Sequence, residues 1–368
     1  MAQASTAGET PWTVQSTPNP NAETVNELSA VSCGSGVACV AVGSQAANLS
    51  SPSRTLAEKW NGTSWRIQRT FLPGGASGAT FDGISCTSAT ACVAVGGAIE
   101  TTTKHTRNLA EAWNGRSWRF LPVSNPSGSV NGWLRAVSCK SQAACTAICT
   151  YDDAQGHQVA VAERWNGAGW HLQAVPKPVS TELFGVSCSG VHACIAVGYE
   201  TSSSGTRPVA EEWNGTSWSM QSVPLPSGFS GGLLSAVACT SASACTATGG
   251  TFGSTSPLAE RWNGVHWAVQ STPAPASASV SHQVITLNGV ACVSTTSCSA
   301  SGEYAPGGRS AYFLESWNGR SWTMVTTPTP TKFRAGALNG IACVVARCTA
   351  VGAWSADQTH ISTLSLAN

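Results

Sequence analysis

The segment Leu28-Ser29-Ala30-Val31-Ser32-Cys33 is followed, after a Ser/Gly-rich turn, by Cys39-Val40-Ala41-Val42-Gly43. The chain continues with Leu56-Ala57-Glu58-Lys59-Trp60, the dipeptide Asn61-Gly62, and Trp65-Arg66-Ile67-Gln68. Short apolar segments rich in Val, Leu and Trp, separated by Gly and Asn-Gly, are typical of β-strands joined by hairpin turns. These residues therefore predict four consecutive strands. Asn-Gly between two apolar segments is a strong hairpin signal, because both turn residues can adopt positive φ.

This four-segment unit recurs about every fifty residues. The first cysteines of successive units lie 53 residues apart between Cys33 and Cys86 and 49 residues apart between Cys139 and Cys188. A period of this length is typical of solenoids and propellers. Four strands make one propeller blade, which buries its faces only against neighbouring blades. No window carries a sustained apolar period of 3.6 residues, so we expect almost no helix.

The two ends of the chain carry complementary parts of one further unit. Pro11-Trp12-Thr13-Val14-Gln15 has the sequence of a fourth strand, and three strands are expected at Leu338–Cys343, Cys348–Gly352 and Ile361–Leu366. Together they complete a composite blade beside six continuous ones. The sequence thus predicts an all-β, seven-bladed propeller with four antiparallel strands per blade. We predict a disordered N-terminal tail over residues 1–10 and a single domain over residues 11–368.

The charge balance excludes several classes of function. Only 10% of the 368 residues are charged, and 19 Lys and Arg against 18 Asp and Glu give a formal net charge of +1. Nucleic-acid binding and polybasic membrane binding both need a basic excess, so neither is expected. The apolar stretches are far shorter than the roughly 20 residues that span a bilayer, so we expect no membrane insertion. A monomer is favoured.

The cysteines form a regular framework. Six pairs have the spacing C-x5-C, the seventh is C-x4-C, and Cys149 is left over from the fifteen. The absence of C-x2-C pairs argues against a metal framework, whereas disulfides across hairpins fit an oxidising compartment. We therefore predict a secreted protein. The predicted disulfides are Cys33-Cys39, Cys86-Cys92, Cys139-Cys145, Cys188-Cys194, Cys239-Cys245, Cys292-Cys298 and Cys343-Cys348.

Gly43 ends the second segment of its unit, and Trp65 follows the Asn-Gly turn; both features recur in most units. In these features the chain resembles kelch-type propellers, and the step from Gly62 to Trp65 is similar to the second half of an Asp-box turn. The resemblance covers nearly the whole chain and implies the propeller architecture. The chain departs from the kelch pattern in its mostly single glycines, its Glu-x-Trp third segment and its cysteines. We carry over no activity, because propellers host many unrelated functions.

The candidate site lies on one face of the predicted propeller. The turns between strands 1 and 2 and between strands 3 and 4 share a face and are nearly constant in sequence. The loops of the other face vary, and function concentrates in variable loops on a rigid support. Five consecutive units place an aromatic residue just after strand 2, and a carboxylate adjoins three of these. The predicted ligand-binding residues are Tyr151, Asp152, Asp153, Tyr199, Glu200, Phe252, Glu303, Tyr304, Trp354, Asp357 and Trp133.

Three functions fit this face. Aromatic rings beside carboxylates suit sugars, so a carbohydrate-binding, lectin-like propeller is the first hypothesis. A second is a glycoside hydrolase or polysaccharide lyase, which would use carboxylates or a His-Tyr-Arg set. A third is a protein-interaction scaffold. No cofactor is expected, although Asp152 and Asp153 are a weak candidate for Ca²⁺. The catalytic candidates for the second hypothesis are Asp152, Glu200, His157, Tyr199 and Arg207.

A glutamate recurs two residues before the third-strand tryptophan. Strand alternation places Glu58 on the same side as Leu56 and Trp60, which we expect to face the next blade. A buried carboxylate must be hydrogen-bonded, so we predict a structural role with backbone or Trp N–H partners. The recurring residues are Glu58, Glu111, Glu163, Glu211, Glu260 and Glu315.

Overall fold

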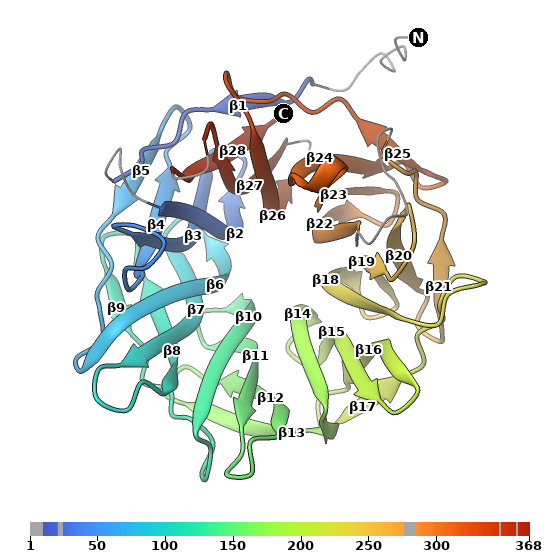
Figure 1. The fold of residues 1–368 in the computed structure, drawn as a ribbon. Coiled ribbons are helices and arrows are strands. Elements are labelled where there is room, and N and C mark those ends of the chain that lie inside the picture. The colour runs from blue at the N-terminus through green and yellow to red at the C-terminus, as the bar shows by residue number, and fades with distance from the viewer. Residues whose placement is uncertain (1–9, 21–24, 276–284, 346, 358–359) are drawn as a thin grey trace.

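The computed structural model describes residues 10–20, 25–275, 285–345, 347–357 and 360–368. Seven four-stranded antiparallel sheets surround a common axis, so the predicted seven-bladed propeller is confirmed (Figure 1). The described residues contain no α-helix and one 3-10 turn, η1 (Pro306–Gly308). No helix among them is long and apolar enough to cross a membrane. The disordered tail predicted over residues 1–10 lies outside the described residues except for Thr10, and it stays a prediction.

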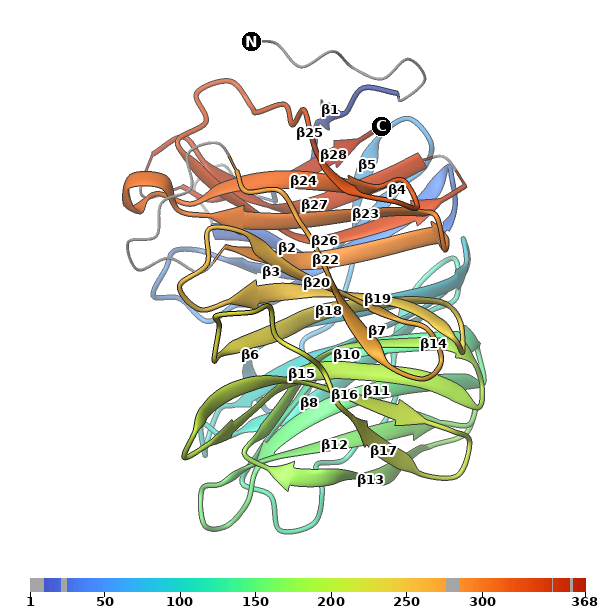
Figure 2. The ribbon, with the colours of Figure 1, turned by 90° about the vertical axis from the view of Figure 1, so that its right-hand side faces the viewer.

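In each blade the four strands lie side by side, and their order in the sheet goes from the axis outward (Figures 1 and 2). The innermost strands are β2 (Val25–Ser35), β6 (Ala76–Ser88), β10 (Asn131–Ser141), β14 (Thr181–Gly190), β18 (Gly232–Ser241), β22 (Thr286–Ser294) and β26 (Ala335–Val344). The second strands are β3 (Ala38–Ala46), β7 (Ala91–Glu100), β11 (Ala144–Asp152), β15 (Ala193–Ser202), β19 (Ala244–Thr251), β23 (Ser297–Tyr304) and β27 (Arg347–Ser355).

The outer half of each blade has two further strands, which are shorter than the inner two in every blade except the one that begins with β10. The third strands are β4 (Arg54–Trp60), β8 (Thr106–Trp113), β12 (Gln158–Trp165), β16 (Gly205–Trp213), β20 (Pro257–Trp262), β24 (Ala311–Trp317) and β28 (Ser362–Ala367). The outermost strands are β5 (Trp65–Gln68), β9 (Trp118–Phe120), β13 (Trp170–Val179), β17 (Trp218–Gln221), β21 (Trp267–Gln270), β25 (Trp322–Val325) and β1 (Thr13–Gln15). We number the blades I (β2–β5) to VI (β22–β25) in chain order, with the composite blade as VII.

Blade VII joins the two ends of the chain. β1 pairs antiparallel with β28, and Val14 lies opposite Leu366. Trp12 is buried in the core of this blade together with Leu338 and Leu366. The predicted closure of the ring by the N-terminal strand is confirmed.

All seven predicted disulfides are present. In each hairpin the two cysteines lie on adjacent strands, as Cys33 and Cys39 do, with Cα atoms 3.9 to 4.0 Å apart. Cys149 is free and completely buried, and burial raises the pKa of its thiol to about 12. It occupies the position that glycine has in the other blades.

The sequence predicts that the second strand ends at Gly43, but the second strands continue past this glycine, to Ala46 in β3 and Ser202 in β15. The glycine instead permits a close contact with the innermost strand. A Cβ atom on Gly43 would lie 2.0 Å from the carbonyl oxygen of Glu27, and one on Gly198 would lie 1.8 Å from that of Glu182. Real Cβ atoms do not approach so closely, so a larger residue requires the backbone to shift. Cys149 occupies this position opposite Leu134 in blade III.

The Trp-Asn-Gly-x-x-Trp turns differ from the expected two-residue turn. Trp60 pairs with Trp65, so four residues form the loop, and the positive φ falls on the glycine, at 100° in Gly62. The asparagine acts through its side chain, because Asn61 Oδ1 accepts from the backbone N–H groups of Thr63 and Ser64 at 3.0 and 2.9 Å. A side chain that caps the turn removes the need for positive φ at asparagine.

The recurring glutamates are buried between blades, but they face the preceding blade rather than the next one. Leu56, on the same side of β4 as Glu58, packs against Val351 of blade VII, and Thr363 of that blade lies beside Glu58. Strand alternation shows which residues share one side of the strand. The handedness of the propeller determines whether that side faces the preceding or the following blade. The expected structural location between blades is otherwise confirmed.

Only some of these glutamates make the hydrogen bonds that we expected. Neither carboxyl oxygen of Glu211, Glu260 or Glu315 has a hydrogen-bond partner among the described residues. Burial raises the pKa of each to about 8, because the charged form loses its hydration. These carboxyl groups are therefore favoured in the neutral, protonated form at neutral pH.

This burial predicts a stability that falls with rising pH. A carboxyl with a pKa of about 8 in the folded state and an ordinary value of 4.5 stabilises the fold fully below about pH 4.5, and this contribution is lost as the pH rises through 8. Glu260→Gln should reduce the pH slope of the unfolding free energy between pH 5 and 8 by up to about 1.4 kcal/mol per pH unit. Chemical unfolding at several pH values measures this slope. Asn48→Ala is the control and should leave the slope unchanged, because Asn48 is exposed and carries no titratable group. Equal slopes for Glu260→Gln and the wild type would refute the effect.

Candidate functional site at the propeller axis

The innermost strand of every blade has a bulge at the same position. In β2, Leu28 pairs with Gly43 and Ala30 pairs with Val42, so Ser29 has no cross-strand partner. A bulge redirects the side chain of the extra residue, and such bulges often adjoin functional sites. The seven bulge residues are Ser29, Asp82, Arg135, Phe184, Ser235, Asn288 and Asn339.

The residue after each bulge is Ala or Gly, because neighbouring innermost strands pass very close together. A Cβ atom on Gly83 would lie 2.9 Å from the Cα of Ala136, and one on Gly185 would lie 3.0 Å from the Cα of Ala236. The bulge residues reach across the same boundary. Asn339 Nδ2, for example, donates to the carbonyl oxygen of Leu28 in the next blade at 3.0 Å.

Trp133, Asp82 and Arg135 form a polar cluster between blades II and III. Trp133 Nε1 donates to Asp82 Oδ2 at 2.6 Å, and Arg135 Nη1 lies 3.5 Å from the same oxygen. The indole ring covers Gly97, where a Cβ atom would lie 2.5 Å from the ring carbons. Glycine at this position therefore makes room for Trp133. The Asp82 and Arg135 side chains remain 26% and 36% exposed.

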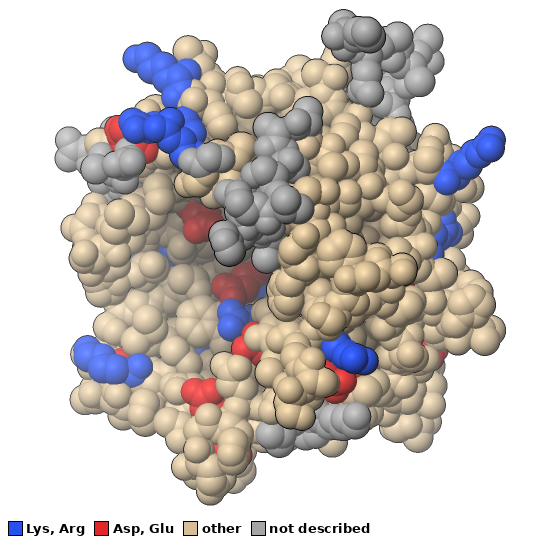
Figure 3. Space-filling model, turned by 45° about the vertical axis from the view of Figure 1, so that its right-hand side comes forward, with Lys and Arg blue, Asp and Glu red and all other residues tan. Residues whose placement is uncertain are grey.

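Further carboxyl groups adjoin this cluster. Asn339 Nδ2 donates to Glu27 Oε1 at 2.8 Å, and the negative charges of Asp82 and Glu303 act on Glu27. Limited hydration near the axis raises the pKa of Glu27 and of Asp82. For Asp82 the hydrogen bond from Trp133 and the charge of Arg135 oppose this rise. Figure 3 shows a hollow in which acidic and basic side chains gather.

A pair of aromatic rings lies near Arg135. The rings of Phe184 and Tyr199 are 5.6 Å apart, and Tyr199 contacts Glu182, its cross-strand partner. Burial and Glu182 raise the pKa of Tyr199, whereas the positive charge of Arg135 lowers it. We call the set Glu27, Asp82, Trp133, Arg135, Glu182, Phe184, Tyr199, Glu303 and Asn339 the axial site.

Three of the predicted site residues, Trp133, Tyr199 and Glu303, belong to the axial site. Four predicted aromatic residues lie at the ends of second strands or in the loops beyond them. Tyr151 and Trp354 are half-buried against the cores of blades III and VII, Tyr304 packs edge-on against Phe313 at 5.9 Å, and Phe252 is 42% exposed.

The predicted aspartates have partners outside the axial site, Asp152 at the end of β11 and Asp153 and Asp357 in the loops beyond second strands. Asp152 accepts from Asn131 Nδ2 at 2.8 Å, Asp153 binds the His157 ring at 3.1 Å, and Asp357 binds the His360 ring at 2.8 Å. Glu200 lies opposite Arg207 in the register of β15 and β16. Among the described residues, no three His, Cys, Asp or Glu side chains gather in a way that could hold a metal ion.

Sequence reasoning missed most of the axial site. The signal is a single variable position inside a constant frame, Leu/Phe-X-Ala/Gly-Val/Ile-Ser/Ala-Cys, as in Leu134–Cys139 and Phe81–Cys86. The constant residues fix the backbone, so the residue at the variable position can change without altering the fold. The missed residues at this position are Asp82, Arg135, Phe184 and Asn339. Glu27 and Glu182, each just before the frame, were also missed and carry no such signal.

No protein-family model matches the sequence, and no curated protein sequence matches it. YCF48 from Cyanidioschyzon merolae matches with a TM-score of 0.54 and 13% identity over 97% of this chain and 98% of that chain. SapL1 lectin, in complex with alpha methyl fucoside, matches with a TM-score of 0.50 and 10% identity over 84% of this chain and 97% of that one.

The Hadza microbial sialidase Hz136 matches with a TM-score of 0.50 and 9% identity over 94% of this chain and 65% of that chain. Likeness at these identities shows a shared propeller fold alone. The resemblance to kelch-type and Asp-box repeats stays a prediction.

The positive charge of Arg135 opposes the rise in the pKa of Asp82, and this effect can be tested. Arg135→Met removes a positive charge beside Asp82, so the pKa of Asp82 should rise further. A pH titration of the Asp82 carboxyl carbon by NMR measures this change. Arg116→Gln, in a constant turn on the opposite face, is the control and should leave the titration unchanged. A lower or unaltered pKa in Arg135→Met would show that the two groups are not in contact.

Proposed function

We propose that the protein is a secreted, non-catalytic, carbohydrate-binding propeller and that the axial site is its ligand site. One observation carries this proposal: Trp133, Asp82 and Arg135 meet in a partly exposed cluster, beside further carboxyl, amide and aromatic groups. These groups lie at the bulge position and next to it. The amino acid at the bulge position differs from blade to blade, whereas the residues around it are nearly constant.

The chemistry of these groups matches that of a sugar. Aromatic faces such as those of Trp133 and Tyr199 cover the C–H face of a pyranose ring, and carboxylates accept hydrogen bonds from its hydroxyl groups. The Arg135 guanidinium and the Asn339 amide supply donors. Because every group lies on or next to a strand of a rigid ring, little side-chain entropy is lost on binding.

The disulfides support a location outside the cell. Seven disulfides are typical of proteins in an oxidising compartment, and secreted proteins are the ordinary case. Extracellular glycans are the sugars that such a protein meets.

A second candidate function is hydrolysis of a polysaccharide at the same site. Glu27 and Asp82 both have raised pKa values and interact electrostatically. A general acid with a raised pKa beside a second carboxylate is the arrangement that glycosidases use. The predicted set of Asp152, Glu200, His157, Tyr199 and Arg207 contributes only Tyr199 to the axial site.

A panel of polysaccharides tests both functions when pull-down and release of reducing ends are measured together. We expect binding without release. Trp133→Leu combined with Asp82→Asn should weaken binding by about tenfold or more, because stacking and a charge-assisted hydrogen bond are both lost. Arg116→Ala, on the opposite face, is the matched control and should bind as the wild type does.

Three results would contradict the proposal. Release of reducing ends would establish a polysaccharide-cleaving enzyme instead. Unchanged binding by a folded Trp133→Leu/Asp82→Asn variant would remove the axial site. Binding of peptides but of no glycan would favour the interaction scaffold; the solved structure of YCF48 bound to D1 peptide shares the fold.

A further inference from the structure

A cation covers the third-strand tryptophan at three of the blade interfaces. The residue before Trp60, Trp165 and Trp262 faces the following blade and places its charge over that blade's third-strand tryptophan. The three pairs are Lys59 over Trp113, Arg164 over Trp213 and Arg261 over Trp317, at 5.4, 5.2 and 5.3 Å from the ring centroid. Such cation–π contacts are favourable, and more so where water is excluded.

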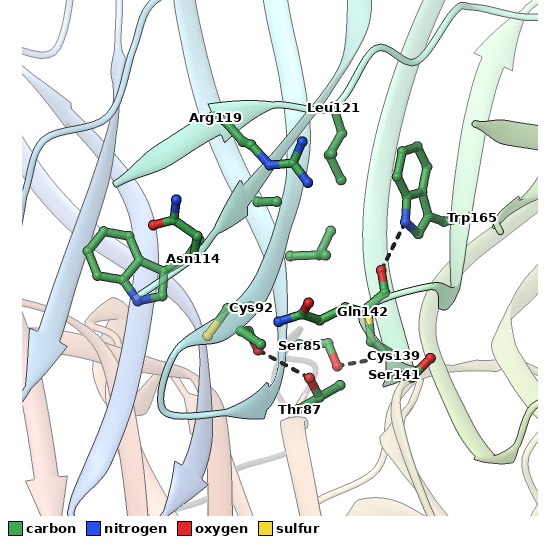
Figure 4. A pocket seen from close by; sticks show the side chains of 14 residues that line it. Ser85, Thr87, Cys92, Asn114, Arg119, Leu121, Cys139, Ser141, Gln142 and Trp165 are labelled. Atoms are coloured by element: carbon green, nitrogen blue, oxygen red, sulfur yellow. Dashed lines mark hydrogen bonds between the residues drawn. The ribbon is translucent and has the colours of Figure 1, made fainter. Parts of the chain in front are cut away.

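The interface between blades II and III lacks this cation. Ala112 occupies the position of Lys59 and Arg164, and a cavity of about 70 Å³ lies beside it. A cavity needs only about 10–15 Å³ of such volume to hold one water, so this one has room for a small planar group. Its lining includes Ala112, Asn114, Arg119, Leu121, Gln142 and Trp165 (Figure 4).

The cavity also keeps the hydrogen-bond acceptor that a guanidinium uses elsewhere in the ring. Between blades VI and V, Arg261 Nη1 donates to the carbonyl oxygen of Thr295 at 2.8 Å, and Trp317 Nε1 donates to the same oxygen at 3.3 Å. Gln142 is the counterpart of Thr295, three residues before the second cysteine. Its carbonyl oxygen accepts from Trp165 Nε1 at 3.0 Å, as Figure 4 shows.

We infer that this cavity binds a guanidinium group supplied from outside the fold, stacked on Trp165 and hydrogen-bonded to the Gln142 carbonyl oxygen. The ligand takes the place that Arg261 has at its own interface. A free guanidinium compound and an arginine side chain of a peptide share this chemistry. The site lies among the constant turns, opposite the variable loops, and does not depend on the proposed sugar binding.

Arg119 sets the strength of binding. It is the cross-strand partner of Ala112, and its exposed side chain projects toward the space between the two blades (Figure 4). Its positive charge lies in water and is partly screened, but it still opposes a second cation. Arg119→Gln should therefore tighten guanidinium binding severalfold.

The test uses fluorine NMR of the full chain labelled with 5-fluorotryptophan and titrated with methylguanidinium. We expect a saturable shift of the Trp165 resonance, which Trp165→Phe assigns. Ala112→Arg should weaken binding by about tenfold or more, because the new side chain fills the cavity. Ala112→Lys serves if that variant does not fold, and Ala112→Ser is the matched control that keeps the cavity open. Lys59→Ala should create a second saturable site at Trp113.

Two further ligands define the chemistry. Methylurea has a similar planar shape without the charge and should bind several times more weakly. A blocked Gly-Arg-Gly peptide should bind more tightly than methylguanidinium if the natural source is a peptide, and no more tightly if it is a small molecule. The inference is overturned if the wild type shows no saturable shift, if the shift persists in Ala112→Arg, or if methylurea binds equally well.

Discussion

The close approach of seven innermost strands around one axis is the constraint on which the rest of the structure depends. At the residue after each bulge, adjacent strands leave room for Ala or Gly only, as the contact between Gly83 and Ala136 shows. Serine hydroxyls secure the same boundary in four blades: Ser32 Oγ accepts from the Cys86 backbone N–H at 2.9 Å, and Ser85 accepts from Cys139 in the same way. A ring packed this tightly fixes where each bulge residue lies.

Both proposed sites lie where one residue departs from the repeat. The cysteines, the capped asparagine turns and the tryptophan pairs build nearly the same blade each time, and they leave few positions free to vary. Asp82 and Arg135 vary at the bulge and create a polar cluster at the axis. Ala112 varies at the cation position and leaves a cavity between blades. Each site is therefore a local change in a scaffold that does not itself change.

Much of the fold could be predicted from sequence because its signals are local and repeated. The cysteine spacing identifies both arms of each hairpin, and Trp12 with residues 361–366 indicates closure of the ring. The axial site could not be found in this way. Its residues are about fifty positions apart, and a bulge breaks the alternation that would show which way Arg135 points. The side faced by Glu58 and the role of Asn61 likewise depend on blade handedness and turn geometry, which single segments do not reveal.

The packing around the axis is tested most directly by the unfolding free energies of two variants at adjacent positions, Ser235→Leu and Ala236→Leu, measured by chemical denaturation without reductant. Ala236→Leu should destabilise the protein by about 1–3 kcal/mol, because a larger side chain is forced against the neighbouring innermost strand. Ser235→Leu should change the unfolding free energy by about 0.5 kcal/mol or less, because Ser235 is the bulge residue, has no cross-strand partner in β19 and is only partly buried. A larger loss for Ser235→Leu than for Ala236→Leu would contradict this account of the bulge and of the site built on it.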